Sequence, residues 1–169
     1  MLFRSNGQGL PTFELLYNTS DAHRVLCEYI QQAWRNNLGV NVNLRNMEWA
    51  SFLDYRRSNP AFQIARAGWL APYLDPNSYL ELLVTGNGSN DGKYSNPEFD
   101  RLVRQAATMP AGADRFRVLN QAEELAITQE QAVIPVYWYV TQNMINLDVC
   151  EGWYSNSMDI HPFTGVRRK

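Results

Sequence analysis

The two histidines lie near side chains whose types and spacing suggest catalysis. His23 follows Asp21 by two residues, and Asp159 and His161 repeat that spacing. A carboxylate beside an imidazole can orient a general base. His23 and Cys27 are four residues apart and share a helix face, where they could hold a metal or activate a thiol. Either role requires a further partner that the sequence does not identify.

The motifs that normally accompany catalysis are missing from this sequence. It contains no G-x-S-x-G nucleophile turn, no P-loop and no G-x-G-x-x-G. We therefore expect no enzyme, no cofactor and no metal site. A small hydrolase that uses His23 or Cys27 is the enzymatic alternative.

Ligand binding fits the stretch of residues 62–80 better. A short apolar strand, F-Q-I-A, is followed by Arg66 and Trp69 and then by a proline-punctuated loop that leads into a helix. Ligands of open α/β sheets bind outside the carboxyl ends of the strands. A guanidinium and an indole at this position are therefore candidate ligand contacts.

Further candidates are His23 at a helix N-terminus, Trp49 after a strand, and Arg56. Basic groups at strand ends and helix starts suit an anion such as a carboxylate, and indoles provide apolar walls with a polar edge. Each residue also has a structural interpretation. Arg56 could be a solvated helix residue, His23 a cap and Trp69 a core residue, while Arg66 could pair with an internal carboxylate.

The elements that must position these residues begin with a strand–helix–strand unit. Residues 12–17 predict a strand, and Ser20 or Asp21 begins a helix whose apolar positions recur at helical spacing as far as residue 37. Gly39 ends this helix, and residues 40–44 alternate as a half-buried strand does. Such a unit implies parallel strands and a right-handed crossover.

The rest of the chain continues the α/β pattern, and we expect a mixed sheet flanked by helices in a single domain over residues 1–169. The expected helices are 49–57, 77–84, one that begins at Pro97, and 113–131; the expected strands are 62–65, 132–139 and 142–149; residues 85–96 form an exposed loop and 150–169 an irregular tail.

Composition excludes several classes of protein. The net charge of −2 and the lack of a long basic run disfavour nucleic-acid binding. No apolar run approaches the roughly 20 residues of a membrane span. The polar start shows no signal peptide and reads as a loop of a mature or truncated chain. Cys27 and Cys150 do not form a C-x-x-C pair, and the sequence leaves a disulfide between them open.

An ordered series of motifs resembles the oligopeptide-binding proteins of peptide ABC importers, the family-5 extracellular solute-binding proteins. The motifs are Y-N-T-S-D-A-H-R (17–24), N-L-G-V-N-V-N-L (37–44), E-W-A-S-F-L-D (48–54), A-R-A-G-W (65–69), D-P-N-S-Y-L (75–80), Y-S-N-P-E-F-D (94–100) and A-V-I-P-V-Y-W-Y-V (132–140). They cover nearly the whole chain in the order and spacing of the family.

The resemblance implies a receptor that closes two lobes on an extended peptide, without chemistry, and delivers it to a membrane permease. This chain would be most of the C-terminal lobe of a class II periplasmic-binding-protein fold, at a periplasmic or cell-surface location. The peptide-binding residues implied by the match are His23, Arg56 and Arg66 for the peptide's carboxylate, Trp49 and Trp69 for side-chain pockets, and Tyr139 near the cleft.

Pro72 departs from the family pattern. The resemblance implies an aspartate there that pairs with the ligand's α-ammonium, and we interpret Asp75, three residues on, as structural. Either the ligand lacks a free amine, or another acidic group replaces the aspartate, or ordinary peptide binding is lost. The last case favours a sensor or scaffold module of the same fold. A partial lobe could also form a homodimer that covers its truncated face.

Overall fold

The computed structural model describes residues 9–58 and 62–169, so most of the expected N-terminal loop, residues 1–8, lies outside the described residues. The chain divides into two compact units, Met1–Trp69 and Leu70–Lys169, which are described separately below. The expectation of a single domain stays a prediction.

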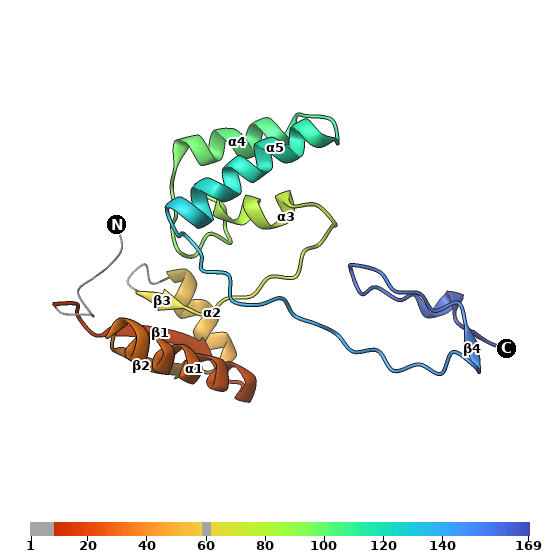
Figure 1. The fold of residues 1–169 in the computed structure, drawn as a ribbon, viewed down its shortest axis with the longest axis horizontal. Helices are drawn as coiled ribbons and strands as arrows, with labels where there is room; N and C mark the ends of the chain where they lie inside the picture. The colour runs from red at the N-terminus through yellow and green to blue at the C-terminus, as the bar shows by residue number, and fades with distance from the viewer. Residues whose placement is uncertain (1–8, 59–61) are drawn as a thin grey trace. The chain divides into compact units, whose positions relative to one another are not determined.

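The first unit is the predicted strand–helix–strand arrangement with one more helix and strand (Figure 1). Its elements are β1 (Phe13–Asn18), α1 (Asp21–Leu38), β2 (Val42–Met47), α2 (Trp49–Ser58) and β3 (Ile64–Ala65). The strands form one parallel sheet in the order β2-β1-β3, with Phe13 opposite Val42 and Leu15 opposite Ile64. Within the described residues this sheet is wholly parallel, whereas the sequence predicted a mixed one.

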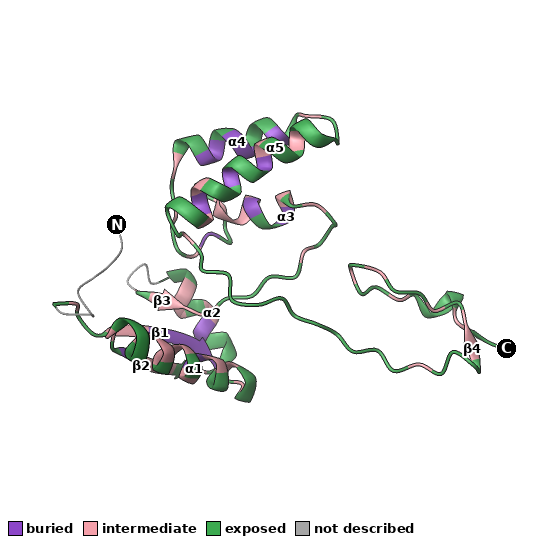
Figure 2. Cartoon of the chain, viewed as in Figure 1, coloured by how far each residue is buried: buried purple, intermediate pink, exposed green. Residues whose placement is uncertain are grey.

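Alternation along β1 explains how the unit is packed. Leu15 and Tyr17 are buried in one cluster with Cys27 of α1 and Val42 of β2. Leu16 points to the other face of the strand, as a period of two requires, and is fully buried, as is Phe52 of α2. The burial colours of Figure 2 show the same contrast between β1 and the outer helix surfaces. Helix α1 ends at Gly39, whose left-handed φ of 67° suits glycine.

The second unit has a helical core. It contains α3 (Asn77–Leu80), a 3₁₀ turn η1 (Glu81–Leu83), α4 (Pro97–Ala107), α5 (Ala113–Glu123) and a π-helical turn η2 (Glu124–Gln129). Their facing sides bury a cluster of Leu80, Phe99, Leu102, Val103, Ala106, Leu119, Ala122 and Ala126 (Figure 2). Pro97 occupies the first turn of α4 as predicted, and the side chain of Asn96 caps that helix by accepting from the amides of Glu98 and Phe99.

The predicted exposed loop of residues 85–96 is organised by a buried side chain. Asn90 is buried, and its amide group donates to the carbonyls of Leu83, Val84 and Tyr94 and accepts from the Tyr94 amide. The loop is therefore ordered by one asparagine that satisfies several backbone groups at once.

The expected strands 132–139 and 142–149 are wrong for this structure. Residues 132–133 form a bend, 134–146 have no regular secondary structure and 147–149 form a turn, and no described strand lies beside these segments to complete a ladder. The tail, which was expected to be irregular, contains a short antiparallel pair, β4 (Cys150–Glu151) with β5 (Arg167–Arg168), and a 3₁₀ turn η3 (Phe163–Gly165). Cys27 and Cys150 are both free thiols.

An ion pair between Asp75 and Arg115 joins the start of α3 to α5. The Asp75 carboxylate accepts from Arg115 at 2.6 and 2.9 Å and from the backbone amide of Asn77 at 2.8 Å. Arg115 also donates to the Ala106 carbonyl at 3.0 Å. The two side chains of this ion pair are only 13% and 25% exposed. The contacts agree with the structural interpretation of Asp75, and the guanidinium lowers the pKa of this carboxyl below its ordinary value of 3.8.

We expect Asp75→Asn to lower the free energy of unfolding by about 1.5–3 kcal/mol at neutral pH, since it removes a charge-assisted bidentate contact. A carboxyl with a lowered folded-state pKa stabilises the fold above its unfolded value of 3.8 and loses that contribution as the pH falls through the folded value. Urea unfolding should therefore show the difference at pH 7 and a shrinking difference below pH 3.8.

Asp114→Asn is the matched control, because Asp114 pairs with Arg117 while both side chains are about three-quarters exposed. Its cost should stay within about 0.5 kcal/mol. Equal losses for the two variants would contradict a structural role specific to Asp75.

Candidate functional site

The carboxyl edge of the first unit's sheet brings three separate segments together. Because the strands are parallel, β1, β2 and β3 all end at this edge (Figure 1). Two backbone hydrogen bonds of 2.8 Å join the segments just past the strand ends, from the Thr19 amide to the Met47 carbonyl and from the Arg66 amide to the Leu16 carbonyl. Residues that follow different strands are thus held at one edge.

His23 and Arg66 are neighbours at this edge. His23 lies in the first turn of α1, directly after β1, and Arg66 follows β3, which pairs with β1. Burial of the imidazole and the positive charge of Arg66 lower the pKa of His23 from its ordinary 6.5, although a hydrogen bond with the backbone of Asn18 opposes them. The imidazole is therefore biased toward its neutral form, and an anion between the two groups would favour its protonated form.

Cys27 lies one helical turn after His23 and is unsuited to be a nucleophile. Its side chain is buried in the core cluster of the first unit. Burial raises the pKa of the thiol, although the charge of Arg66 acts in the opposite direction. A thiol held protonated is a weak nucleophile and a weak metal ligand. The contacts of Cys27 therefore favour core packing over the hydrolase alternative.

Trp49 and Arg56 share one face of α2 with the buried ring of Phe52. The rings of Trp49 and Phe52 stack with centroids 6.1 Å apart, and the guanidinium of Arg56 lies 5.1 Å from the centroid of Phe52. Glu48 begins this helix by accepting from the amides of Ala50 and Ser51. Trp49 thereby sits at the carboxyl edge with about half of its surface exposed.

Trp69 and Tyr139 are the remaining predicted site residues. Trp69 is the last residue of the first unit and is partly exposed. Tyr139 belongs to the second unit, where its ring meets that of Tyr137 with centroids 4.9 Å apart. Their place in a common site stays a prediction.

Asn18 is a further candidate that was not predicted from the sequence. It is the last residue of β1 and is buried, and its side-chain oxygen accepts no hydrogen bond from any residue that the structure describes. A buried acceptor without a donor is costly, so this oxygen is suited to a donor from water or ligand. A polar residue that closes an otherwise apolar strand was the available signal.

The second Asp–His pair is formed in the tail. The ring of His161 approaches Asp159 at 2.8 Å and stacks on Trp153 with centroids 3.9 Å apart. Asn143 also donates to the Asp159 carboxylate, and the contact with His161 is the main cause that lowers the pKa of that carboxyl. Through Asn143, the pair joins the residues that precede the tail to the tail itself, which is a packing role. Asp21, by contrast, is fully exposed beside Arg24.

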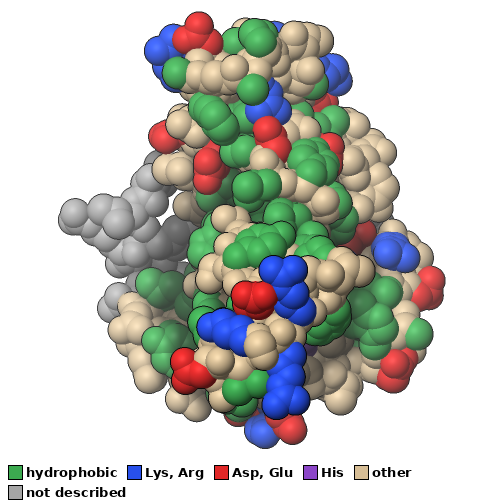
Figure 3. Space-filling view, turned by 90° about the vertical axis from the view of Figure 1, so that its right-hand side faces the viewer, with side chains coloured by type: hydrophobic (Ala, Val, Ile, Leu, Met, Phe, Trp, Pro, Cys, Tyr) green, Lys and Arg blue, Asp and Glu red, His purple; other side chains and the backbone are tan. Residues whose placement is uncertain are grey.

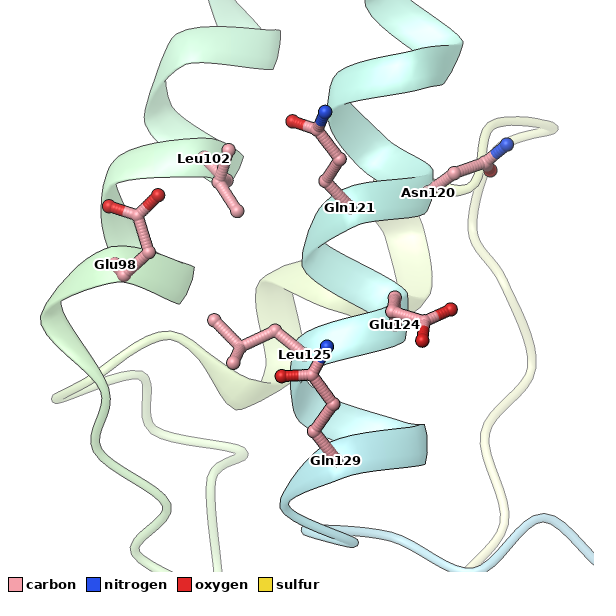
Figure 4. Close-up of a pocket in the computed structure, with 7 residues that line it drawn as sticks. All are labelled: Glu98, Leu102, Asn120, Gln121, Glu124, Leu125 and Gln129. Atoms are coloured by element: carbon pink, nitrogen blue, oxygen red, sulfur yellow. The ribbon is translucent and has the colours of Figure 1, made fainter.

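Two grooves in the structure are lined by residues other than the predicted ones. One, of about 450 Å³, runs between α4 and the α5–η2 helix; Figure 4 shows Leu102 and Leu125 in it and Glu98 and Glu124 beside it. The other, of about 290 Å³, is lined mainly by apolar side chains, including Phe13 at the amino end of β1. Neither groove includes a predicted site residue.

Within residues 9–58 and 62–169, no group of three His, Cys, Asp or Glu side chains could hold a metal ion. None of the helices in the same ranges is long and apolar enough to cross a membrane.

A parallel sheet flanked by helices defines an α/β lobe, and the carboxyl edge of such a sheet is where ligands of open α/β folds bind. The family described as bacterial extracellular solute-binding proteins, family 5 Middle, matches residues 2–91, and the chain belongs to this family.

Relatives and solved structures agree with this assignment. The periplasmic oligopeptide-binding protein OppA of Salmonella typhimurium is 40% identical over 134 residues, which are 79% of this chain and 24% of that protein. The dipeptide-binding protein DppE of Bacillus subtilis is 40% identical over 144 residues, 85% of this chain and 26% of that protein. The structure of Burkholderia pseudomallei OppA matches with a TM-score of 0.78 and 30% identity, covering 92% of this chain and 30% of that one. The chain spans about a quarter of the length of these curated relatives.

We expect the NMR titration midpoint of the His23 ring to lie below 6.5, and Arg66→Gln to raise it, because a nearby positive charge disfavours the imidazolium. Since the folded state resists this proton more than the unfolded state does, the contribution of His23 to stability falls as the pH drops through 6.5 toward the folded value.

Arg24→Gln serves as the control, because the Arg24 guanidinium pairs with Asp21 and Glu28. It should leave the His23 midpoint nearly unchanged. A midpoint that responds equally to both substitutions, or to neither, would rule out a specific coupling between His23 and Arg66.

Proposed function

We propose that this chain is part of the substrate-binding component of an ABC importer for oligopeptides and that it binds an extended peptide without chemistry. The observation that supports this most directly is the convergence of His23, in the first turn of α1, and Arg66, just after β3, at the carboxyl edge of one sheet. Relatives that match most of this chain are named as oligopeptide- and dipeptide-binding proteins. The rest of the receptor would form the other lobe, and the loaded receptor would deliver its peptide to a membrane permease from a periplasmic or cell-surface location.

The proposed roles follow from the chemistry of each side chain. Arg66 and protonated His23 bind the peptide's terminal carboxylate, because charge-assisted hydrogen bonds are the strong ones. Trp49 forms an apolar wall beside them, and the amide oxygen of Asn18 accepts from a peptide N–H. On the family resemblance, Arg56 is a further proposed contact for the carboxylate, Trp69 is proposed to line a side-chain pocket, and Tyr139 is proposed to lie near the cleft.

Pro72 bears on whether the ligand needs a free α-amine. Asp75, the nearest acidic residue along the loop, is bound by Arg115 and does not replace the aspartate that the family resemblance implies. We propose that this loop does not hold the ligand's α-amine. Blocking the peptide's α-amine therefore removes no contact with this loop.

A chimera tests the proposal. The matched region of Salmonella typhimurium OppA is replaced by this chain, and peptide binding is measured by titration calorimetry. Arg66→Gln should weaken the binding of a free tripeptide by about ten- to a hundred-fold, because a hydrogen bond to a charged group is worth about 1.5–3 kcal/mol. The same substitution should change the binding of the C-terminally amidated tripeptide much less.

Arg24→Gln in the same chimera is the control for a general loss of positive charge, and its peptide affinity should stay within about twofold. Equal losses for the free and the amidated peptide on Arg66→Gln would contradict carboxylate recognition. For the isolated chain we expect no micromolar binding of a tetrapeptide, because it supplies only one side of the cleft.

A further inference from the structure

The loop of residues 85–96 contains an Asn-Gly pair, Asn87–Gly88, that peptide binding does not use. Backbone and uncharged polar side chains, drawn in tan, make up much of the face in Figure 3, and reactions with solvent can occur on such surfaces. Gly88 is exposed, and a β-carbon added to it would meet no heavy atom within 4 Å. The Gly88 nitrogen is therefore open to approach, because glycine has no side chain that shields its backbone.

Two hydrogen bonds hold Asn87 in a tight turn. Its carbonyl accepts from the Asn90 amide at 3.0 Å, and its side-chain oxygen Oδ1 accepts from the Ser89 amide at 2.8 Å. The second bond is that of an Asx turn, and it closes a ring of atoms that contains both the Asn87 Cγ and the Gly88 nitrogen. The two atoms that must join to form a cyclic imide are thus held within one small ring.

The hydrogen bonds of this turn leave the attacking and the departing nitrogen available. Within the described residues, the Gly88 amide donates no hydrogen bond, and the side-chain Nδ2 of Asn87 donates none either. The Ser89 N–H, by contrast, donates to Oδ1, the oxygen that gains negative charge when a nitrogen attacks Cγ. A donor held at that oxygen stabilises the charge, as in an oxyanion hole.

We propose that Asn87–Gly88 is a site of spontaneous deamidation. The Gly88 nitrogen gives its proton to a base in solvent and attacks the Asn87 Cγ. The new N–C bond forms as the Cγ–Nδ2 bond breaks, and Nδ2 takes a proton from water and leaves as ammonia. Water then opens the cyclic imide at either carbonyl, which gives aspartate or isoaspartate. The reaction consumes only water, involves no oxidation or reduction, and is independent of peptide binding.

Other asparagines of the chain lack one or more of these features. Asn156 also accepts backbone amides through its Oδ1, but its Nδ2 donates to the Ile160 carbonyl at 2.9 Å, and the next residue is Ser157, which has a β-carbon. Asn96 precedes Pro97, whose nitrogen carries no proton and cannot attack. We therefore expect Asn87 to react before either of them.

Isoaspartate at position 87 would change the loop as well as its charge. It routes the main chain through the former side chain and so lengthens the backbone between residues 87 and 88. The turn bond from the Asn90 amide to the carbonyl of residue 87 then no longer fits. Asn90 is the buried residue whose amide group satisfies the backbone of this loop. We expect the loop to loosen, with faster hydrogen exchange of the Asn90 amide.

Peptide mapping by mass spectrometry tests the proposal. The purified chain is kept folded at mildly alkaline pH and digested with trypsin, and fragment spectra of the peptide of residues 67–93 locate the small mass gain that results when an amide becomes an acid. Gly88→Ala should slow the gain at Asn87 by roughly tenfold or more, equivalent to about 1.4 kcal/mol in the barrier, because its β-carbon obstructs the attack. Alanine fits there without strain, since the surroundings are open and the φ of Gly88 is not left-handed.

Gly92→Ala is the matched control, because Gly92 lies in the same loop with equally open surroundings but does not follow an asparagine. It should leave the rate at Asn87 within about twofold. The folded chain should react no more slowly than the same chain unfolded in urea. A slower reaction in the folded chain would overturn the proposal, because the turn would then protect Asn87. Equal rates for the wild type and Gly88→Ala, or an earlier mass gain at Asn156, would also overturn it.

Discussion

The parallel pairing of β1 with both of its neighbours is the constraint on which the candidate site depends. Only parallel strands end at the same edge, so only this pairing lets the residues after three separate strands meet. The register is fixed by burial, because a slip of one residue would turn Leu15 and Tyr17 out of the cluster with Cys27. Hydrogen bonds past the strand ends, at Thr19 and Arg66, extend the alignment into the site.

Electrostatics at this edge agree with the proposed anion site. Burial and the charge of Arg66 lower the pKa of the neighbouring His23 imidazole and bias it toward its neutral form, which reduces the repulsion between the two groups. A carboxylate would interact favourably with both groups and with the positive end of α1. Burial of Cys27 raises the pKa of its thiol and keeps it protonated in the core. The four-residue spacing of His23 and Cys27 is therefore explained by the packing of α1.

The sequence predicted those elements that depend on local patterns. Alternation identified β2 and helical spacing identified α1, and Gly39 and Pro97 marked a helix end and a helix start. The order of strands led to the prediction that His23, Trp49 and Arg66 lie at one edge. Features that depend on distant partners were not predictable. Asp75 meets Arg115 forty residues away, and the burial of Asn90 and Asn18 follows from packing that no local pattern encodes. Residues 132–140 have the composition of a strand, but a strand exists only where another lies beside it.

The central claim is that a peptide's carboxylate binds at the carboxyl edge of the β2-β1-β3 sheet. The most direct test is amide-resolved NMR of the chain, titrated with a free tripeptide and, separately, with its C-terminal amide. NMR detects weak binding, so one side of a cleft is sufficient. The account predicts shift changes at residues 18–24, 47–50 and 64–69 that are much larger for the free acid than for the amide. Equal changes for the two peptides, or changes confined to the groove between α4 and α5, would contradict it.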